Sequence, residues 1–405
     1  MMNDATRQFI HDHRLEDVRQ LALKGKGAAG VDMPFALRQI AGWQTARTKL
    51  PSWAAVDGII YPPHLNMEQC SGEATARYKA SLVSRDFEIS KSPQVFLDLT
   101  GGFGVDFSLM SRPCSQRIYV ERDPVLCEFA RHNFQMLGLE AEVVCDDAAS
   151  YLTTMSHADV IFLDPARRDD HGGRTYDIKD CTPNVIALLP LLKEKAGTII
   201  LKLSPMLDWH KAVEDLGGVS EVHIVSVDNE CKELLLVVSS VPPLEGEESM
   251  AVHCVNLQSK EKDQYFSFSY GRACPPPSKV EVTDGTSFLF EPNASIMKAG
   301  CFQALAHQYE VQQAAVHSHL FLSDHDVSDF PGRRFRVEVM TTMNKQELRK
   351  ALTGIEKANI AVRNFPMTAE TLRKKLKLKD GGDMFIFGTT LSDATHLLFI
   401  CRKIG

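Results

Sequence analysis

One stretch, Val95–Asp106, constrains this chain of 405 residues more than any other. Val95–Leu97 is a short apolar run typical of a buried parallel strand, and Thr100–Gly104 gives the backbone freedom to turn sharply into a helix. A second apolar run follows and ends at Glu121. This order predicts the first strand, turn and helix of a nucleotide-binding α/β sheet.

The glycine pattern departs from the dinucleotide fingerprint in two ways. Gly102 and Gly104 fit the start of G-x-G-x-x-G, but Phe107 stands where the third glycine should be. Asp98 ends the first strand, where a carboxylate repels a pyrophosphate and attracts an ammonium such as that of a methionine moiety. Glu121 ends the second strand and can accept hydrogen bonds from both ribose hydroxyls. These features favour S-adenosylmethionine over NAD.

The same residues resemble motif I and its acidic partner in class I S-adenosylmethionine-dependent methyltransferases. The resemblance extends to Val143–Ala148, in which Asp147 would meet the adenine amine, and to Val160–Arg167 after a fourth strand. It implies that acidic strand ends and the glycine turn hold the cofactor. The expected cofactor-binding residues are Asp98, Thr100, Gly101, Gly102, Gly104, Glu121 and Asp147.

A segment just upstream of the first strand adds two further candidates. In many class I methyltransferases this segment closes over the methionine end of the cofactor, and Gln69 and Ser71 stand at that place here. The alternative is that Ser71 is a plain N-cap of the helix that leads to the strand.

The composition of the chain and the spacing of its cysteines limit the class of protein to which it can belong. A hydrophobic content of 44% and a charged content of 24% are ordinary for a soluble chain. The chain has no apolar run long enough to span a membrane and a polar beginning, so we expect a cytoplasmic protein with no membrane partner. The ten cysteines form no C-x-x-C pair, so we expect reduced thiols and no metal.

The chain is expected to fold as an α/β protein in four parts. Apolar residues at helical spacing predict an N-terminal helical domain over residues 1–90. Residues 91–241 alternate strand and helix and end in a hairpin, which predicts a Rossmann-like, seven-stranded class I methyltransferase domain. Two small α+β domains are expected over residues 250–330 and 331–405.

The last part is basic although the whole chain is acidic. Residues 331–379 carry 13 Lys and Arg against four Glu, a local balance of +9, whereas the net charge of the whole chain is −7. Such asymmetry indicates a surface that faces a polyanion, although a solvated basic surface is the alternative.

In this C-terminal part the chain resembles a bacterial family of candidate methyltransferases with a ferredoxin-like unit and a THUMP-like C-terminal domain. The resemblance rests on the stretches Glu-Gln-Cys-Ser, Asp-Pro-Ala-Arg-Arg, Lys-x-Ser-Pro and Arg-Asn-Phe-Pro. Because THUMP domains are associated with RNA modification, it implies structured RNA, tRNA or rRNA, as substrate and partner.

The reacting groups are expected at the carboxyl ends of the strands. Asp164–Arg167 occupies the place where amino-methyltransferases of bases carry a hydrogen-bond acceptor, two prolines and an aromatic ring. Asp164 keeps the acceptor for an exocyclic amine, and Arg167 replaces the ring and could stack on a base or clamp a phosphate. These two are the expected catalytic residues. The expected substrate-binding residues are Lys202, Ser204, Pro205 and Arg363, although Lys202 could equally be a surface cation.

Other chemistries are less well supported by the residues present. Methylation at pyrimidine C5 needs a cysteine nucleophile, but Ala166 and Ser204 stand where related families place it. His171, in the loop Asp169–Arg174, could be a general base or an exposed histidine, and the arginines around that loop could form a substrate lip or pair with its aspartates. The favoured function is methylation of a nucleobase in RNA. The alternatives are methylation of a small molecule or protein, and a cofactor-binding, RNA-associated protein without catalysis.

Overall fold

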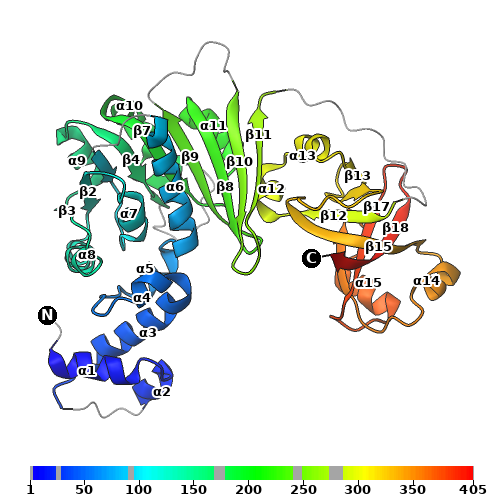
Figure 1. The fold of residues 1–405 in the computed structure, drawn as a ribbon, viewed down its shortest axis with the longest axis horizontal. Coiled ribbons are helices and arrows are strands. Elements are labelled where there is room, and N and C mark those ends of the chain that lie inside the picture. The colour runs from blue at the N-terminus through cyan, green and yellow to red at the C-terminus, as the bar shows by residue number, and fades with distance from the viewer. Residues whose placement is uncertain are drawn as a thin grey trace. The chain divides into compact units, whose positions relative to one another are not determined.

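The computed structural model describes residues 3–23, 29–89, 95–167, 178–239, 249–272 and 286–404. The chain divides into two compact units, Met1–Val222 with Glu233–Glu248 and His223–Lys232 with Ser249–Gly405. The division passes through one hairpin, formed by β8 (Val219–Val227) and β9 (Glu230–Ser239). Figure 1 shows the helices and strands of both units.

The first unit is built on five parallel strands. These strands are part of a nine-stranded sheet, in which the seven strands from β8 to β3 lie in the order β8–β9–β7–β4–β1–β2–β3, with β9 antiparallel to its neighbour β7. This order confirms the predicted doubly wound sheet, and β1, the middle one of the five parallel strands, carries the glycine turn. The parallel strands are β1 (Val95–Asp98), β2 (Gln116–Glu121), β3 (Glu142–Cys145), β4 (Ala158–Leu163) and β7 (Ala196–Leu203).

Parallel connections normally cross over in the right-handed sense, which places helices on both faces of a sheet. Helix α6 contacts α7, and α9, α10 and α11 contact one another in succession. The helices are α6 (Glu73–Ile89), α7 (Val105–Met110), α8 (Pro124–Met136), α9 (Ala148–Thr154), α10 (Val185–Lys195) and α11 (Trp209–Leu216). A small ribbon of β5 (Ala166–Arg167) and β6 (Cys181–Thr182) follows β4, and the 3-10 turn Ile178–Asp180 immediately precedes β6.

The N-terminal helices belong to the same compact unit as this sheet. The indole of Trp53 lies 4.8 Å from the ring of Phe103, which is part of the glycine turn. Asn133 of α8 exchanges two hydrogen bonds with the backbone of Ile60, at 2.8 and 2.9 Å. Trp53 therefore packs directly against the turn, and Ile60 is held by α8. The N-terminal helices are α1 (Asp4–His13), α2 (Val18–Leu23), α3 (Met33–Lys49), α4 (Pro51–Ala54) and α5 (His64–Gln69).

The second unit carries a seven-stranded sheet in the order β13–β14–β12–β15–β18–β17–β16. Strand β12, from the predicted domain 250–330, pairs with β15, from the predicted domain 331–405, so these two parts share one sheet. The strands are β12 (Phe288–Pro292), β13 (Gln312–Gln313), β14 (Phe321–Ser323), β15 (Gly332–Thr342), β16 (Asn359–Arg363), β17 (Met384–Thr390) and β18 (His396–Ile404).

Helices and a further hairpin complete the second unit. Strand β10 pairs antiparallel with β11, and the helices α14 and α15 each carry basic residues in their last turn. The elements are β10 (Met250–Leu257), β11 (Gln264–Tyr270), α12 (Ala294–Ala299), α13 (Phe302–Gln308), α14 (Lys345–Ala351) and α15 (Ala369–Leu376).

Two compositional expectations can be compared with the described residues. None of the helices that the structure describes is both long and apolar enough to cross a bilayer. The nine cysteines in the described ranges are free thiols, and Cys274 lies outside those ranges.

Candidate functional site

The central strand β1 ends in a buried carboxylate. Asp98 is 1% exposed, and its Oδ1 accepts a hydrogen bond from the Thr100 N–H at 2.9 Å. No Lys, Arg or His side chain in the described ranges lies within ion-pair distance of it. Burial raises the pKa of Asp98 well above its ordinary value, and the nearby carboxylates Asp106, Asp164 and Glu121 raise it further. A buried carboxylate without a counter-ion favours a cationic group of a ligand at this edge of the sheet.

The glycine turn owes its sequence to two close packing contacts. A Cβ atom on Gly101 would lie 2.1 Å from the ring of Tyr119, and one on Gly104 would lie 2.8 Å from the ring of Phe134. Gly104 also has φ +85°, which favours glycine. At Gly102, by contrast, a Cβ would meet nothing nearer than a backbone oxygen at 3.8 Å. The space next to Gly102 is therefore open to a ligand.

Glu121 joins this turn to the end of β2. Its Oε2 accepts a hydrogen bond from the Gly102 N–H at 2.8 Å, and its Oε1 accepts one from the Asp123 N–H at 2.9 Å. A carboxylate has about four acceptor positions, so about two remain for ligand hydroxyls. The two backbone bonds fix the orientation of the carboxylate before any ligand binds.

Asp147 follows β3 and caps helix α9. Its Oδ1 accepts hydrogen bonds from the N–H groups of Ala149 and Ser150, at 2.9 and 3.4 Å. Its Oδ2 makes no hydrogen bond to the part of the chain that the structure describes. The N-cap holds the side chain in place and leaves one oxygen for an amine donor.

The expected acceptor Asp164 is linked to the turn after Asp98 through a hydroxyl. Thr100 Oγ1 accepts a hydrogen bond from the Asp164 N–H at 2.6 Å, so the turns after β1 and β4 are joined. The Asp164 side chain is 37% exposed, whereas the Lys202 side chain that forms an ion pair with it is 11% exposed. Desolvation raises the pKa of Asp164, and the charge of Lys202 only partly offsets this. The Asp164 side chain is thus partly accessible and is held by the less exposed Lys202.

Lys202 faces the protein interior. Burial alone would lower its pKa, but the carboxylates of Asp164, Asp106 and Glu233 outweigh that effect and raise it. The ammonium is held by Asp164, so it is not the surface cation that the sequence left open. The ammonium of Lys202 therefore interacts with the carboxylate of Asp164 and not with solvent.

The remaining acceptor-side residues follow strands β4 and β7. Ser204 and Pro205 come directly after β7, and Ser204 Oγ accepts a hydrogen bond from the Met206 N–H at 3.3 Å. The backbone of Arg167 pairs with β6, but its side chain lies outside the described part of the structure. Residues 168–177, which include Arg168, His171 and Arg174, also lie outside it.

Ser71 occupies a different environment from Gln69. Gln69 ends α5 and is exposed. Ser71 is buried, and its hydroxyl donates to Asp106 Oδ2 at 2.6 Å and accepts from Lys79 Nζ at 3.0 Å. Helix α6 begins at Glu73, and Ser71 does not cap it with its side chain. Of the two alternatives for Ser71, the plain helix cap is therefore wrong.

Sequence reasoning missed Lys79, Asp106 and Glu233, which surround Ser71. Two signals were available: Lys79 is a lysine within a partly apolar helix, and Asp106 closely follows the glycine turn. Both are weak signals, because lysines on helices are mostly exposed.

Arg363 lies at the end of β16 in the second unit. Its Nη2 donates to Glu291 Oε1 at 2.7 Å, and Arg333 forms an ion pair with Glu291 Oε2. Glu291 is 4% exposed, so the two arginines compensate a buried charge. Arg363 therefore already has a structural role.

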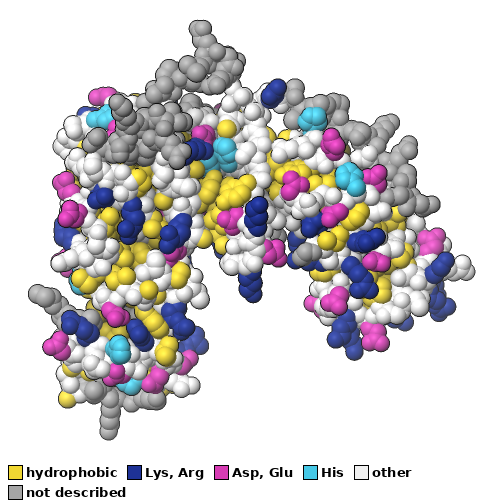
Figure 2. All heavy atoms as spheres, viewed as in Figure 1, with side chains coloured by type: hydrophobic (Ala, Val, Ile, Leu, Met, Phe, Trp, Pro, Cys, Tyr) yellow, Lys and Arg dark blue, Asp and Glu magenta, His cyan; other side chains and the backbone are white. Residues whose placement is uncertain are grey.

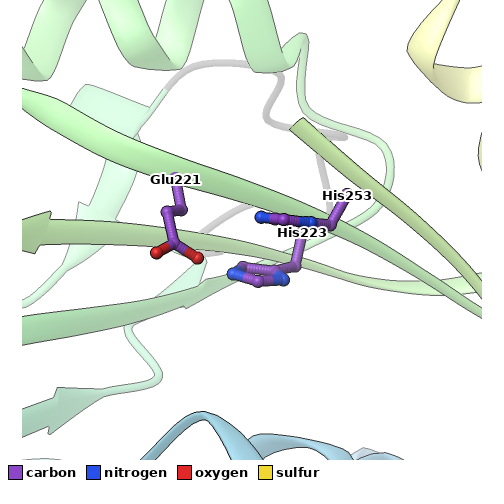
Figure 3. A group of neighbouring side chains, drawn as sticks. All are labelled: Glu221, His223 and His253. Carbon is purple, nitrogen blue, oxygen red and sulfur yellow. The ribbon is translucent and has the colours of Figure 1, made fainter. Parts of the chain in front are cut away.

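A group of three potential metal ligands lies on β8 and β10 (Figure 3). The rings of His223 and His253 stack 4.6 Å apart with an angle of 15° between them, and His253 Nδ1 hydrogen bonds to Ser267 Oγ. Both oxygens of Glu221 accept from Arg85, at 2.7 and 2.8 Å. Because the rings lie parallel and Arg85 compensates the carboxylate, we assign no metal to this group.

Three known families match parts of the chain. The family described as THUMP domain-like matches residues 332–403, and the one described as a ferredoxin-like domain matches residues 288–331. The family described as conserved hypothetical protein 95 matches residues 85–181.

Relatives also match over nearly the whole length. A candidate methyltransferase of known crystal structure from Porphyromonas gingivalis is 30% identical, with a TM-score of 0.84, and the match covers 100% of both chains. An uncharacterized S-adenosylmethionine-dependent methyltransferase, found in two strains of Mycobacterium tuberculosis, is 22% identical over 377 residues, which cover 89% of this chain and 97% of the relative.

Proposed function

Because the chain belongs to the S-adenosylmethionine-dependent methyltransferases, we propose that it transfers the methyl group to a nucleobase of structured RNA. The observation that carries the RNA part is a set of cations without ion-pair partners among the described residues, on the part of the chain that matches the THUMP domain-like family.

These cations remain after the ion pairs of the second unit are accounted for. Five of the 13 Lys and Arg of residues 331–379 have a carboxylate partner: Arg333, Arg334, Arg363, Arg373 and Lys374. The other eight form no ion pair with any described residue, and all are exposed: Arg336, Lys345, Arg349, Lys350, Lys357, Lys375, Lys377 and Lys379. Figure 2 shows Lys and Arg side chains on the visible surface around α14 and α15. Exposed cations that repel one another favour a polyanionic partner.

Four of these lysines lie at or near the end of α15. Lys377 is the C-cap of α15 and Lys375 lies in its last turn. Lys357 and Lys379 form an isolated parallel β-bridge, which places their backbones side by side. We call Lys357, Lys375, Lys377 and Lys379 the lysine cluster. Within the proposal, the lysine cluster contacts RNA phosphates, and Arg363 acts through Glu291 by anchoring β16.

The residues of the first unit fit S-adenosylmethionine, which supplies a methyl group on a sulfonium when bound. Asp98 would hold its ammonium, because a cation compensates this buried carboxylate. The free acceptor positions of Glu121 would hold the ribose hydroxyls, and Asp147 Oδ2 would accept from the adenine amine. Gly102 lets the cofactor approach the backbone, and Gln69 would lie over its methionine end.

On the acceptor side, Asp164 would accept a hydrogen bond from the exocyclic amine and so orient its lone pair towards the methyl group. Pro165 stiffens the turn after β4, and Lys202 holds the Asp164 carboxylate from the interior. Ser204 and Pro205 would border the base. An RNA substrate also keeps the proposed location cytoplasmic.

The decisive experiment is mass spectrometry of nucleosides in total RNA from cells that lack the gene. A missing modified nucleoside, restored by the wild-type protein and not by Asp164→Ala, would establish both the substrate and the atom. An unchanged nucleoside profile would reject RNA in favour of a small molecule or protein. RNA that binds the protein but gains no methyl group in vitro would favour the non-catalytic alternative.

RNA binding itself is tested with the lysine cluster. Replacing Lys375, Lys377 and Lys379 together by glutamine should weaken RNA binding and make the slope of log affinity against log salt shallower, by about 0.7 for each phosphate that is no longer neutralised. Lys374→Gln is the matched control, because Lys374 lies on the same helix but is paired with Glu370 at 2.7 Å. Equal effects of the triple variant and the control would show that the cluster is only solvated surface.

A further inference from the structure

A buried network of charges joins four elements of the first unit. The side chain of Lys79, in the middle of α6, is 0% exposed. Its ammonium lies 2.5 Å from Glu233 Oε2, 3.0 Å from Ser71 Oγ and 3.1 Å from Asp106 Oδ1. The ammonium donates hydrogen bonds to Ser71 and Glu233, whereas Asp106 Oδ1 lies within ion-pair distance without accepting a hydrogen bond. The residues come from the α5–α6 turn, α6, α7 and β9.

The carboxylates of this network outnumber its cation. Glu233 Oε1 also accepts from Thr75 Oγ1 at 2.7 Å, and the side chains of Glu233 and Asp106 are 5% and 11% exposed. Although burial opposes ionisation, Lys79 and Lys202 hold the pKa of Glu233 below its ordinary value, so Glu233 is charged at neutral pH. By formal charge, the two carboxylates Asp106 and Glu233 outweigh the one ammonium of Lys79, so the network carries one net negative charge.

The network lies near the expected reacting groups. Asp106 interacts electrostatically with Asp98 and Asp164, and Lys79 with Asp164. The pair Lys202–Asp164 adds one formal charge of each sign, so it leaves the net formal charge of this region unchanged. A net negative charge that is shielded from water acts over several ångströms, because the local dielectric constant is lower than that of water.

We infer that Asp106 and Glu233, held by Lys79 and Ser71, determine specificity for the charge on the cofactor sulfur. The substrate cofactor carries a sulfonium, whereas the product, S-adenosylhomocysteine, carries a neutral thioether. The network attracts the first and gives no such attraction to the second, so it favours binding of the substrate cofactor and release of the product. This inference rests on the cofactor placement in the proposed function, but not on RNA as the substrate.

The test is the ratio of the affinities for S-adenosylmethionine and S-adenosylhomocysteine, measured by calorimetry on the full chain. Glu233→Gln and Asp106→Asn each remove one negative charge and keep the shape of the side chain. In each variant the preference for the sulfonium cofactor should fall by about three- to tenfold, because the attraction of one charge at several ångströms is removed. Affinity for the neutral product should change much less.

A matched control is available on the same helix. Glu221 forms an ion pair with Arg85 of α6 at 2.7 Å, near the surface, so Glu221→Gln also removes a carboxylate partner of this helix. It should leave the affinity ratio unchanged. Equal decreases in affinity for both ligands, or an unchanged ratio in Glu233→Gln and Asp106→Asn, would show that the network is only structural and would overturn the inference.

A failure of the cofactor placement would be recognised separately. If the placement is right, Glu121→Ala should weaken binding of both ligands by about tenfold or more, since the variant lacks the carboxylate that accepts the ribose hydrogen bonds. Full affinity in Glu121→Ala would remove this edge of the sheet from the site. A fall in the ratio together with an unchanged RNA profile would instead leave the inference standing and reject only the RNA substrate.

Discussion

At the scale of single residues, Asp98 is the group whose environment differs most from that of an ordinary surface aspartate. Its carboxylate is buried, accepts a backbone hydrogen bond and has no cationic partner among the described residues. Lys79 and Lys202 are instead paired with Glu233 and Asp164. The folded protein thus keeps one uncompensated acidic group at the place where a ligand ammonium is expected.

Asp98→Asn should therefore separate stability from cofactor binding. Because the pKa of Asp98 is raised in the folded state, folding takes up a proton, and the unliganded protein loses stability as the pH rises from about 4 through the folded pKa. The asparagine variant lacks this loss. Relative to wild type, its free energy of unfolding without cofactor should therefore increase with pH, by about 1.4 kcal/mol per unit of pKa shift. Melting temperatures of both proteins, measured without cofactor over this pH range, test the prediction.

The same substitution should abolish the charge that meets the ammonium. Affinity for S-adenosylmethionine should fall by about tenfold or more at pH 8, and the increase in affinity with pH expected of wild type should disappear. Calorimetry between about pH 5 and about pH 9 measures both the affinity and its dependence on pH. A wild-type affinity that does not depend on pH would contradict the assignment of Asp98.

Lys202→Met addresses the acceptor carboxylate. Lys202 counteracts the desolvation of Asp164, so its removal should raise the pKa of Asp164 further. The acid limb of the pH dependence of methyl transfer should move to higher pH, and the rate at pH 7 should fall by about tenfold or more. Lys202→Arg should restore much of the rate. An increased KM with an unchanged pH profile would instead indicate that Lys202 binds the substrate.

At the scale of elements, the turn between β1 and α7 combines two requirements in adjacent residues. Gly101 is needed because the ring of Tyr119 occupies the place of a side chain, whereas Gly102 faces open space with φ +55°. Gly101 therefore serves the packing of the turn, and its neighbour Gly102 leaves space for a ligand. The turn was predicted from its glycines, but this division was not.

Gly101→Ala should mainly reduce stability, whereas Gly102→Ala should mainly reduce cofactor binding. Gly101→Ala should destabilise the protein by about 1–3 kcal/mol, because the added methyl overpacks against Tyr119. Gly102→Ala should cost only about 1 kcal/mol for the left-handed backbone, but should weaken cofactor binding by filling the open space. Thermal unfolding without ligand and calorimetry with ligand measure the two effects. Equal melting temperatures for both variants would contradict the packing argument.

At the scale of the whole molecule, the C-terminal parts behave as one sheet. Strand β12 pairs with β14 on one side and with β15 on the other, and Leu289 and Phe290 of β12 are 0% exposed. Cutting the chain between the two parts would expose this core. The family boundary near residue 331 is therefore not a boundary between independent folding units.

A chain that ends at residue 330 should lose the fold of residues 286–330 and keep cofactor binding. The loss follows because β15 to β18 supply most of the sheet against which β12 packs. Hydrogen exchange should show unprotected amides in β12 and β14, while the affinity for S-adenosylmethionine should stay within about threefold of wild type, a change of less than 1 kcal/mol. Protected amides in β12 would show that the ferredoxin-like part folds alone.

The sequence by itself determined the order of strands and turns and the acidic residues that end or follow the strands. Helix α8 runs from Pro124 to Met136, and its initial proline, its apolar spacing and the glycine that follows it are all local signals. The doubly wound sheet follows from such signals in the right order, whereas the methyltransferase family was indicated by the resemblance of the motif residues. Local periodicity was sufficient for the sheet because a strand or a turn depends mostly on its neighbours in the chain.

Only the tertiary structure decided which charges compensate one another. Lys79 meets Glu233 across 154 residues, Arg363 meets Glu291 across 72, and Lys202 meets Asp164 across 38. No periodicity records such partners, so Lys202 and Arg363 were assigned to the substrate and Lys79 was overlooked. Burial makes these pairings decisive, because a charge removed from water must find a partner within the packed protein.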